Sequence, residues 1–447
     1  MKFYDRKKEL AILEKTRQTA FSTASQMTVL TGRRRIGKTR LILKSCELTP
    51  TVYLFVSRNA EAALCSGFSE VIRESLGIFV PDGITTFRDI FRLCMEAGKQ
   101  KPFNLVIDEF QEFFYINASV YSEVQDIWDR TKDSSHVNLI LSGSVYTLMH
   151  RIFQDYREPL YGRAATIIKL KPFPVSTLKQ ILSDYFPGYD NDSLLAFYAF
   201  TGGVPKYIEL LADRKAFTPE VIINEMIQES SVFIEEGNVM LMQEFGKKYG
   251  VYYSILSAIA SGINEPSQIS EVTGQRSLGG SLQRLEEDYD VIVKKRPVLS
   301  KPSSQNVRYE INDHFLHFWF RYIVRYQNLV QTGKYEQLRD IVKRDYPDYS
   351  GHELEKYFMD KIVETEDVEQ VGSWWESSRG KKPADTDQHE IDIVAVYFGG
   401  KKVLIAECKR QRKNFKPEKF RQKVELLRTR LFANSEITTK CLTLEDM

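Results

Sequence analysis

The feature that most constrains the fold is an eight-residue run near the N-terminus, which fits the phosphate-binding loop pattern G-x-x-x-x-G-K-S/T. It reads Gly32-Arg33-Arg34-Arg35-Ile36-Gly37-Lys38-Thr39. In this pattern the glycines let backbone N–H groups turn inward around phosphate oxygens, the lysine reaches the β- and γ-phosphates, and the final hydroxyl holds Mg²⁺. Residues 27–31 before the run are typical of a short buried strand, and residues 40–44 open a helix. The sequence therefore predicts the strand–loop–helix setting of a nucleotide phosphate site.

A second apolar run, over residues 103–107, ends in two acids, Asp108 and Glu109. A buried parallel strand has this pattern when its C-terminal end opens onto a nucleotide site. Asp108 is then expected to hold Mg²⁺ through water, and Glu109 to orient or deprotonate the attacking water. The alternative is a helix N-cap with a first-turn acid. Together with the loop, the pair predicts ATP and Mg²⁺ as ligands and Lys38, Asp108 and Glu109 as catalytic residues of an ATPase.

Further predicted strands alternate with helices at residues 51–56, 137–141 and 165–170. This alternation favours an α/β fold with a parallel sheet, right-handed crossovers and helices on both faces. Ligands on such sheets bind at the carboxyl ends of the strands, where the loop and Asp108 fall. The small polar residues that end at Ser144 follow the 137–141 strand, in a position suited to sensing a γ-phosphate.

Composition narrows the class of protein. The 447 residues suggest about three domains, and 43% apolar with 27% charged residues is ordinary for a soluble globular chain. The net charge of +2 says little about partners. Five widely spaced cysteines without a C-x-x-C pair argue against a disulfide framework or a structural zinc site. Because there is also no signal-like N-terminus and no apolar run of membrane-spanning length, we expect a cytoplasmic protein without a membrane partner.

The motifs of residues 3–205 together resemble the archaeal-type ATPases of the AAA+/STAND group, which also occur in bacteria. The resemblance rests on residues 3–10, the phosphate loop, and four motifs: Val106-Ile107-Asp108-Glu109-Phe110-Gln111, Leu141-Ser142-Gly143-Ser144, Tyr161-Gly162-Arg163 and Gly202-Gly203-Val204-Pro205. It implies that Pro205 contacts the adenine and that Arg163 senses phosphate, within one chain or across a homo-oligomer. Pro205 could equally open a helix after the two glycines, and Arg163 could equally be a surface or interface arginine.

The predicted nucleotide ligands combine the loop with these more distant positions. They are Gly32, Arg33, Arg34, Arg35, Ile36, Gly37, Lys38, Thr39, Arg40, Ser144, Arg163 and Pro205. Thr39 and Asp108 are the predicted Mg²⁺ ligands at this site.

Residues 252–312 follow the plan of a winged helix-turn-helix, with three short helices and a predicted β-hairpin. Leu278, Leu282 and Leu285 share one face of the third helix. In a DNA-binding winged helix, this third helix would enter the major groove, and basic residues of the hairpin would meet phosphates. The candidate contacts are Gln275, Arg276, Ser277, Gln283, Arg284, Lys294, Lys295, Arg296 and Lys301. Winged helices also serve as protein-contact modules, and the third helix carries acids, so DNA and a protein partner both stay open.

The stretch from Phe315 to about Asp345 is helical and rich in aromatic residues. Aromatic residues at this density and at helical spacing indicate core or inter-domain packing rather than base stacking. His314 and His317 lack a third ligand nearby, so they are interpreted as structural.

A second chemistry is predicted near the C-terminus. Two strand-like segments flank Gly399-Gly400, a strong signal for a two-residue hairpin turn. In that register, antiparallel partners have numbers that sum to 799, which sets Asp392 opposite Glu407 and Lys409 on the same face. Two carboxylates that face each other repel. A Mg²⁺ ion between them would offset this repulsion, and a lysine close by would stabilise the charge that develops on a scissile phosphate.

This hairpin resembles the metal site of the PD-(D/E)xK nuclease superfamily, and the wider region resembles the DUF234-type nuclease-like domain that often follows these ATPases. The resemblance implies that Asp392 and Glu407 bind metal, that Lys409 completes a catalytic triplet with them, and that Glu355 is the upstream helical acid. Many such domains keep the fold and lose activity. From residue 401 to 430 there are twelve Lys/Arg against three acids, a basic face suited to nucleic acid or, alternatively, a solvated helix.

The predicted fold class is α/β, with five domains. They are a phosphate-loop ATPase core (1–173), a helical lid (174–245), a winged helix (246–313), a helical linker (314–345) and an α/β restriction-endonuclease-like domain (346–447). Two functions follow. The first is an ATPase whose nucleotide cycle controls DNA binding and cleavage by the C-terminal domain. The second is an ATP-dependent switch or scaffold whose downstream domains bind DNA or a protein without cleavage.

Overall fold

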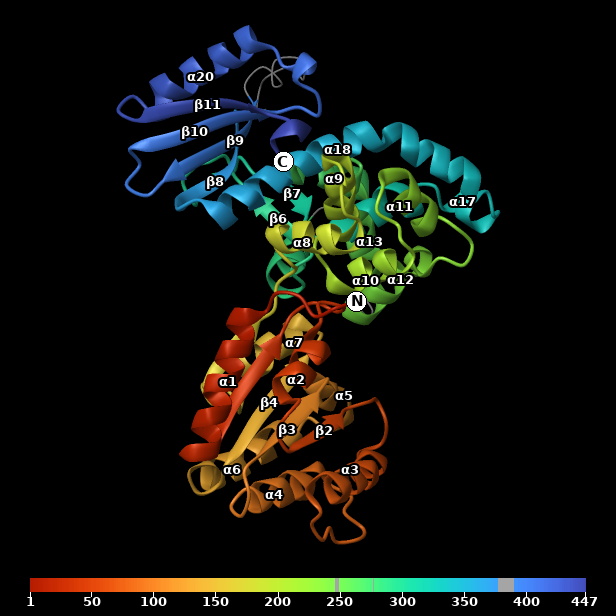
Figure 1. The fold of residues 1–447 in the computed structure, drawn as a ribbon, viewed down its shortest axis with the longest axis vertical. Coiled ribbons are helices and arrows are strands. Elements are labelled where there is room, and N and C mark those ends of the chain that lie inside the picture. Colours follow the sequence, from red (N-terminus) through yellow and green to blue (C-terminus); the bar gives the residue numbers. More distant parts are fainter. Residues whose placement is uncertain (246–248, 276, 377–389) are drawn as a thin grey trace. The chain divides into compact units, whose positions relative to one another are not determined.

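The computed structural model describes residues 1–245, 249–275, 277–376 and 390–447, and it divides into two compact units (Figure 1). The N-terminal unit comprises Tyr4–Pro172, and the C-terminal unit comprises Met1–Phe3 with Phe173–Met447. The candidate DNA contact Arg276 lies outside the described residues. Within these ranges, no helix has both the length and the apolar character needed to cross a bilayer.

The N-terminal unit is built on a five-stranded parallel sheet in the order β2-β3-β4-β1-β5. Its strands are β1 (Gln26–Thr31), β2 (Thr51–Phe55), β3 (Phe103–Asp108), β4 (Val137–Gly143) and β5 (Thr166–Lys169). Each lies where the apolar runs predicted a strand, and the α/β class is confirmed. β3 and β4 are buried along their whole length, as the unbroken apolar pattern of a central parallel strand requires.

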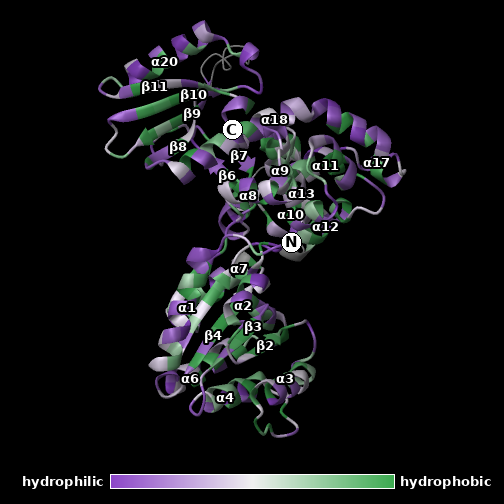
Figure 2. Ribbon diagram, in the orientation of Figure 1, coloured by the Kyte–Doolittle hydropathy of each residue, from purple (hydrophilic) through white to green (hydrophobic). Residues whose placement is uncertain are grey.

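Helices cover both faces of this sheet. They are α1 (Lys7–Ser22), α2 (Lys38–Cys46), α3 (Glu61–Leu76), α4 (Phe87–Ala97), α5 (Phe113–Ile116), α6 (Val120–Thr131) and α7 (Tyr146–Gln154), with 3₁₀ turns η1 (Phe110–Glu112) and η2 (Lys132–Ser134). Alternate residues of the strands, such as Val29 and Leu139, pack with residues of α3, α4, α6 and α7 into one core. Figure 2 shows the central strands in the green of apolar residues.

The C-terminal unit begins with a helical region. Its helices are α8 (Val175–Tyr185), α9 (Asn191–Thr201), α10 (Pro205–Asp213), α11 (Pro219–Met226), α12 (Val232–Phe245), α16 (His314–Phe318), α17 (Gln327–Gln331) and α18 (Tyr335–Thr365), with the π-helix η5 (Trp319–Val324). The aromatic stretch is core, as predicted, because Phe315, Phe318 and Trp319 are buried. α18 is continuous through residue 345, where a domain boundary was predicted, and it packs on both α9 and β8.

The predicted helices and hairpin of residues 252–312 are present in the expected order. They are α13 (Tyr249–Ala260), α14 (Pro266–Thr273), α15 (Gly279–Gln283) continued by the π-helix η4 (Arg284–Asp288), β6 (Ile292–Lys295) and β7 (Arg308–Ile311). Leu278, Leu282 and Leu285 are buried, so the predicted apolar face of the third helix is confirmed.

The C-terminal sheet has four strands in the order β11-β10-β9-β8. Its elements are β8 (Val368–Trp375), β9 (Glu390–Tyr397), β10 (Lys402–Cys408), α20 (Pro417–Leu431) and β11 (Glu436–Leu442), with 3₁₀ turns η7 (Arg412–Asn414) and η8 (Leu444–Asp446). β8 and β9 are antiparallel, β9 and β10 are antiparallel, and β10 and β11 are parallel. The sheet is therefore mixed. Val403 pairs with Val396 and Ala406 with Ile393, so the predicted register, in which partner numbers sum to 799, is confirmed.

The loop between β6 and β7 is docked on β8. The Val298 N–H donates to the Ser373 carbonyl at 3.0 Å, and the Val298 side chain joins the core of the C-terminal sheet. The Arg308 guanidinium lies 4.7 Å from the ring centroid of Trp375 and pairs with Glu390 at 3.0 Å. Because β8 is an edge strand, this contact covers an edge that would otherwise be open to other chains.

Candidate functional site

The phosphate loop lies between β1 and α2 and needs both of its glycines. Gly32 has a φ of 149°, and a Cβ there would stand 2.8 Å from the Leu170 carbonyl oxygen. Gly37 has a φ of 90° and directly precedes the first turn of α2. The backbone of the loop therefore turns tightly enough for its N–H groups to surround a phosphate.

Lys38 is buried, with its ammonium directed at the loop backbone. Its Nζ donates to the carbonyl oxygens of Gly32 at 2.9 Å and Arg33 at 3.2 Å. The ammonium thus lies inside the curve of the loop, the position from which it can reach a bound phosphate. Arg34 and Arg40 are exposed, and Arg35 is held at a φ of 68°.

Arg6 is a structural support of the site that sequence reasoning missed. Its Nη2 donates to the carbonyl oxygens of Lys171 at 2.8 Å and Ile36 at 3.5 Å, so it ties the start of α1 to the loop and to the end of β5. Burial lowers the pKa of its guanidinium. The only sequence signal was its place in the 3–10 stretch that contributed to the ATPase resemblance.

The predicted magnesium ligands lie together. The Thr39 hydroxyl donates to Oδ2 of Asp108 at 3.1 Å, and the Glu109 N–H donates to Oδ1 at 3.0 Å. A hydroxyl and a carboxylate at this spacing are the oxygen donors that Mg²⁺ prefers. The donor set therefore fits Mg²⁺.

Tyr53, on β2, also donates its hydroxyl to Oδ2 of Asp108. Burial, followed by the hydrogen bond to Asp108, raises the pKa of Tyr53, so the phenol stays a donor at neutral pH. The sequence could not point to this contact, because it depends on the pairing of β2 with β3, in which Phe55 lies beside Asp108. The hydroxyl therefore helps to orient a predicted metal ligand.

We expect Tyr53→Phe to raise the Mg²⁺ concentration needed for half-maximal ATP hydrolysis by about 10-fold, because removing a partner that orients a metal ligand weakens metal binding by that order. Mg²⁺ titrations of phosphate release would measure it. Tyr115→Phe, on an exposed tyrosine of α5, is the control. A wild-type Mg²⁺ requirement in Tyr53→Phe would show that the hydroxyl has no role in metal binding.

Glu109 is held in one orientation beside Asp108. Its backbone is left-handed, with φ 55° and ψ 39°, a conformation that costs a non-glycine residue free energy and is concentrated at functional sites. Its Oε2 accepts from the Ser144 hydroxyl at 2.7 Å and from Nε2 of the fully buried Gln111 at 2.5 Å. The structure thus joins two predicted residues, Glu109 and Ser144, and adds Gln111, which sequence reasoning missed.

Arg163 and Pro205 were assigned by resemblance alone, and the structure shows the local setting of each. Arg163 forms a bidentate pair with Asp129, at 2.8 and 3.1 Å, and donates to the carbonyl oxygens of Pro159 and Tyr161. These contacts are those of a structural surface arginine. Pro205 is the first residue of α10, directly after Gly203 and Val204, which is the helix-opening alternative. Their contacts with a nucleotide stay predictions.

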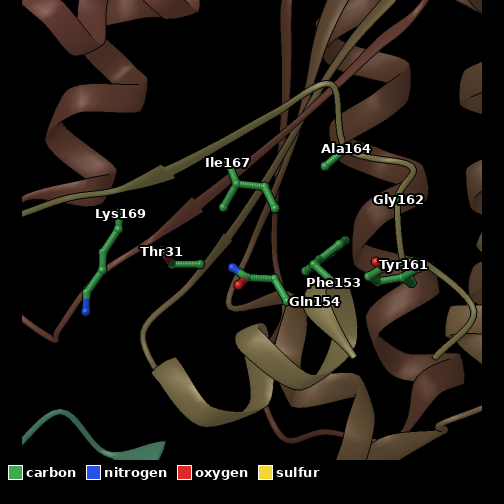
Figure 3. A pocket seen from close by; sticks show the side chains of 8 residues that line it. All are labelled: Thr31, Phe153, Gln154, Tyr161, Gly162, Ala164, Ile167 and Lys169. Carbon is green, nitrogen blue, oxygen red and sulfur yellow. The ribbon is translucent and has the colours of Figure 1, made fainter. Parts of the chain in front are cut away.

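A cavity of about 640 Å³ lies beside β1 and β5, on the side of α7 (Figure 3). Its lining residues are Thr31, Phe153, Gln154, Tyr161, Gly162, Ala164, Ile167 and Lys169. None of the predicted nucleotide ligands is among them, so this cavity does not contribute to the site assignment.

In the C-terminal unit, the predicted carboxylates and lysine converge. The Lys409 Nζ lies 3.5 Å from both Asp392 Oδ2 and Glu407 Oε1. Asp392 is also held by the Cys408 N–H, at 2.8 Å. Lys423, on α20, adds a second ammonium 3.1 Å from Glu407 Oε1 and was missed by sequence reasoning. Two acids and two lysines therefore form one compact cluster.

Glu355, on α18, belongs to the same electrostatic environment. Burial, followed by the negative charge of Asp392, raises the pKa of Glu355 well above its ordinary value. Burial also raises the pKa of Asp392, although Lys409 opposes the shift. Within the described ranges, no group of three or more His, Cys, Asp or Glu side chains has the arrangement of a metal site. The metal-binding role of Asp392 and Glu407 stays a prediction.

The candidate DNA contacts of the winged helix divide into exposed and paired residues. Ser277, Gln283, Arg284 and Lys301 are exposed. Lys295 is paired with Glu310 at 2.7 Å, which neutralises one of the predicted phosphate contacts. The loop that follows Lys295 packs on β8. Of the two predicted DNA-contacting elements, the third helix is therefore the more accessible.

Two family models match separate parts of the chain, one with the predicted ATPase motifs and one with the predicted C-terminal cluster. Residues 3–211 match a family model described as an ATPase domain predominantly from Archaea. Residues 319–421 match DUF234, described as archaeal and bacterial proteins of unknown function. The N-terminal match covers the phosphate loop, Asp108, Glu109 and Ser144. The C-terminal match contains Asp392, Glu407 and Lys409, and it assigns no activity to them.

Two individual proteins extend over most of the chain. An uncharacterized protein of Methanocaldococcus jannaschii is 28% identical over 419 residues, which cover 91% of this chain and 87% of that protein. The solved structure of a Walker-type ATPase of Pyrococcus abyssi matches with a TM-score of 0.56 and 19% identity, over 71% of this chain and 96% of that one. The second comparison shows a shared fold. Together with the match of residues 3–211 to an ATPase-domain model, it shows that the N-terminal unit has the fold of a phosphate-loop ATPase domain.

Proposed function

We propose that this protein is a Mg²⁺-dependent ATP hydrolase that couples its nucleotide state to DNA binding. The observation that carries the proposal is the contact of Thr39 with Asp108, 3.1 Å apart, directly beside the oriented carboxylate of Glu109. A predicted metal-binding pair with a carboxylate beside it, at the carboxyl edge of one parallel sheet, is an arrangement suited to phosphoryl transfer to water.

Each residue has a distinct role in this proposal. Lys38 and the loop N–H groups bind the phosphate oxygens and balance their negative charge. Thr39 and Asp108 would hold Mg²⁺, which when bound neutralises charge that develops on the phosphates. Glu109 orients the attacking water and accepts its proton. Ser144 and Gln111 keep the Glu109 carboxylate in place through their hydrogen bonds to Oε2.

DNA is the proposed partner because exposed cations and polar side chains gather on two surfaces of the C-terminal unit. The third helix of the winged-helix region exposes Gln283 and Arg284, residue types that contact base edges and phosphates. The segment between β10 and α20 exposes Lys413 and Lys416, and the first turn of α20 exposes Lys419. Clustered lysines neutralise phosphates and release counterions, so binding through them weakens as salt rises.

A second candidate function is metal-dependent cleavage of DNA at the C-terminal cluster. Lys409 at 3.5 Å from both Asp392 and Glu407 favours it, because this places a cation where a scissile phosphate would carry its charge. Asp392 and Glu407 would hold the metal, which when bound activates a water for attack on phosphorus. The same ion pairs also suit a cluster that binds DNA without cutting it, since the two lysines already balance the two acids.

One experiment separates these functions. Duplex and single-stranded DNA are incubated with the protein and Mg²⁺, with ATP, with ADP and without nucleotide, and both binding and strand cleavage are measured. Under the first proposal, DNA affinity changes between ATP and ADP. An affinity that is independent of nucleotide would contradict the coupling.

Cleavage, if it occurs at this cluster, is expected to fall by two or more orders of magnitude in Asp392→Ala, because a metal ligand is lost. Asp367→Ala, which changes an exposed acid just before β8, is the matched control. Equal cleavage by Asp392→Ala, or none by wild type under all conditions, would leave the ATP-dependent DNA-binding switch as the function.

A further inference from the structure

A polar cavity of about 330 Å³ lies between η5 and α18 in the C-terminal unit, apart from the sites described above. Its volume is within the range of small-ligand sites, roughly 300–1,000 Å³. The lining residues are Arg321, Tyr322, Arg325, Tyr326, Ile341, Arg344, Asp345 and Asp348. Arg321 and Tyr322 belong to η5, Arg325 and Tyr326 lie in the turn that follows it, and the other four share one face of α18. Three arginines, from η5, the turn after it and α18, therefore line one hollow.

Arg321, which lines this cavity, is fixed in place by its partners. Its Nε and Nη2 donate to Asp345 Oδ2 at 2.9 and 2.8 Å, and the Tyr322 hydroxyl donates to the same oxygen at 2.5 Å. Its guanidinium also lies 5.8 Å from the ring centroid of Tyr349. The charges of Arg321 and Asp345 therefore balance each other, and the pair forms a rigid wall.

Arg325 and Arg344 differ from Arg321 in their exposure and their hydrogen bonding. Both are exposed, and among the described residues neither makes a hydrogen bond or an ion pair with a carboxylate. The Arg325 guanidinium lies 5.7 Å from the ring centroid of Tyr326. Two guanidinium groups thus share a hollow with the exposed Asp348 and with Asp345, whose charge also interacts with Arg325 but whose hydrogen bonds go to Arg321 and Tyr322. Guanidinium groups without a protein acceptor are well suited to the planar, bidentate recognition of phosphate oxygens.

We propose that this cavity, which we call the arginine cavity, binds a phosphodiester group of DNA through Arg325 and Arg344. Three arginines and two aspartates give its lining a net charge of +1, which matches the single negative charge of one phosphodiester. Tyr326 supplies an aromatic surface beside it, against which a sugar or base can pack. The inference rests on the proposed function in taking DNA as the partner. It adds a DNA contact in the part of the chain that lies, in sequence, between the winged-helix region and the C-terminal sheet.

The test is DNA binding by the full-length protein over a series of NaCl concentrations. Fluorescence anisotropy of labelled duplex and single-stranded oligonucleotides gives Kd and its salt dependence for wild type, Arg325→Gln/Arg344→Gln and the control Lys334→Gln. Lys334 is an exposed cation that immediately precedes α18 and lies outside the arginine cavity. Because both arginines are exposed, we expect the double variant to keep the wild-type unfolding midpoint.

We expect the double variant to bind DNA about 10-fold more weakly at low salt, with the slope of log K against log salt reduced by about 1, because one phosphate contact is lost. Lys334→Gln should behave as wild type. If wild type binds DNA and the double variant matches it in Kd and slope, the arginine cavity is not a DNA contact, and the proposed function stands without it. If wild type binds no DNA, the DNA-binding part of the proposed function fails together with this inference.

Discussion

Lys38→Ala is expected to abolish ATP hydrolysis, with kcat reduced by at least about 100-fold, the order found when one preorganised donor to a transition-state charge is removed. The physical reason is the position of the ammonium inside the phosphate loop, 2.9 Å from the Gly32 carbonyl oxygen. Alanine leaves the phosphates without that positive charge. Release of inorganic phosphate at saturating ATP and Mg²⁺ measures the effect.

Lys44→Ala is the control for this variant. Lys44 lies on the same helix, pairs with the surface residue Glu47 and is about half exposed, so its removal changes the net charge equally without touching the loop. Thermal unfolding of both variants shows whether the chain remains folded. Unchanged phosphate release in a folded Lys38→Ala protein would mean that the loop does not bind the phosphates as proposed.

Glu109→Gln is expected to lower kcat by a factor on the order of 10²–10⁴ and to leave ATP binding nearly unchanged, because the amide cannot accept a proton from the attacking water. The substitution is conservative here. The amide oxygen can still accept the hydrogen bond that the Ser144 hydroxyl donates to Glu109 at 2.7 Å. Single-turnover hydrolysis, together with the affinity for a fluorescent ATP analogue, separates the two effects.

Glu96→Gln, on the exposed surface of α4, is the matched control. Loss of both binding and hydrolysis in Glu109→Gln would assign Glu109 a structural role through its left-handed backbone. Hydrolysis at the wild-type rate would remove it from the mechanism and leave the helix N-cap alternative that the sequence also allowed.

The parts of the fold that follow from local pattern were predictable. The apolar runs at residues 27–31 and 103–107 located β1 and β3 because a central parallel strand is apolar on both faces. The loop glycines identified a turn that only glycine fits at Gly32, where a Cβ would meet a backbone oxygen. The Gly399-Gly400 turn predicted the β9–β10 register, since a two-residue turn determines which residues of a hairpin are opposite.

The supports of the candidate sites were not predictable in this way. Tyr53 reaches Asp108 only because β2 lies beside β3, and Gln111 reaches Glu109 only because the chain turns back directly after the strand. Lys423 approaches Glu407 from a helix that begins nine residues after that strand ends. None of these contacts leaves a periodic or spaced pattern in the sequence.

The sequence by itself determined the strands of the N-terminal sheet, the phosphate loop and the register of β9 with β10, because each depends on residues that are close in the chain or on one short turn. Only the tertiary structure decided that α18 runs through a predicted boundary, that the β6–β7 loop covers β8, and that Arg163 pairs with Asp129. These features arise from packing between segments far apart in the chain, where shape and charge must match in space. A one-dimensional pattern does not record that match.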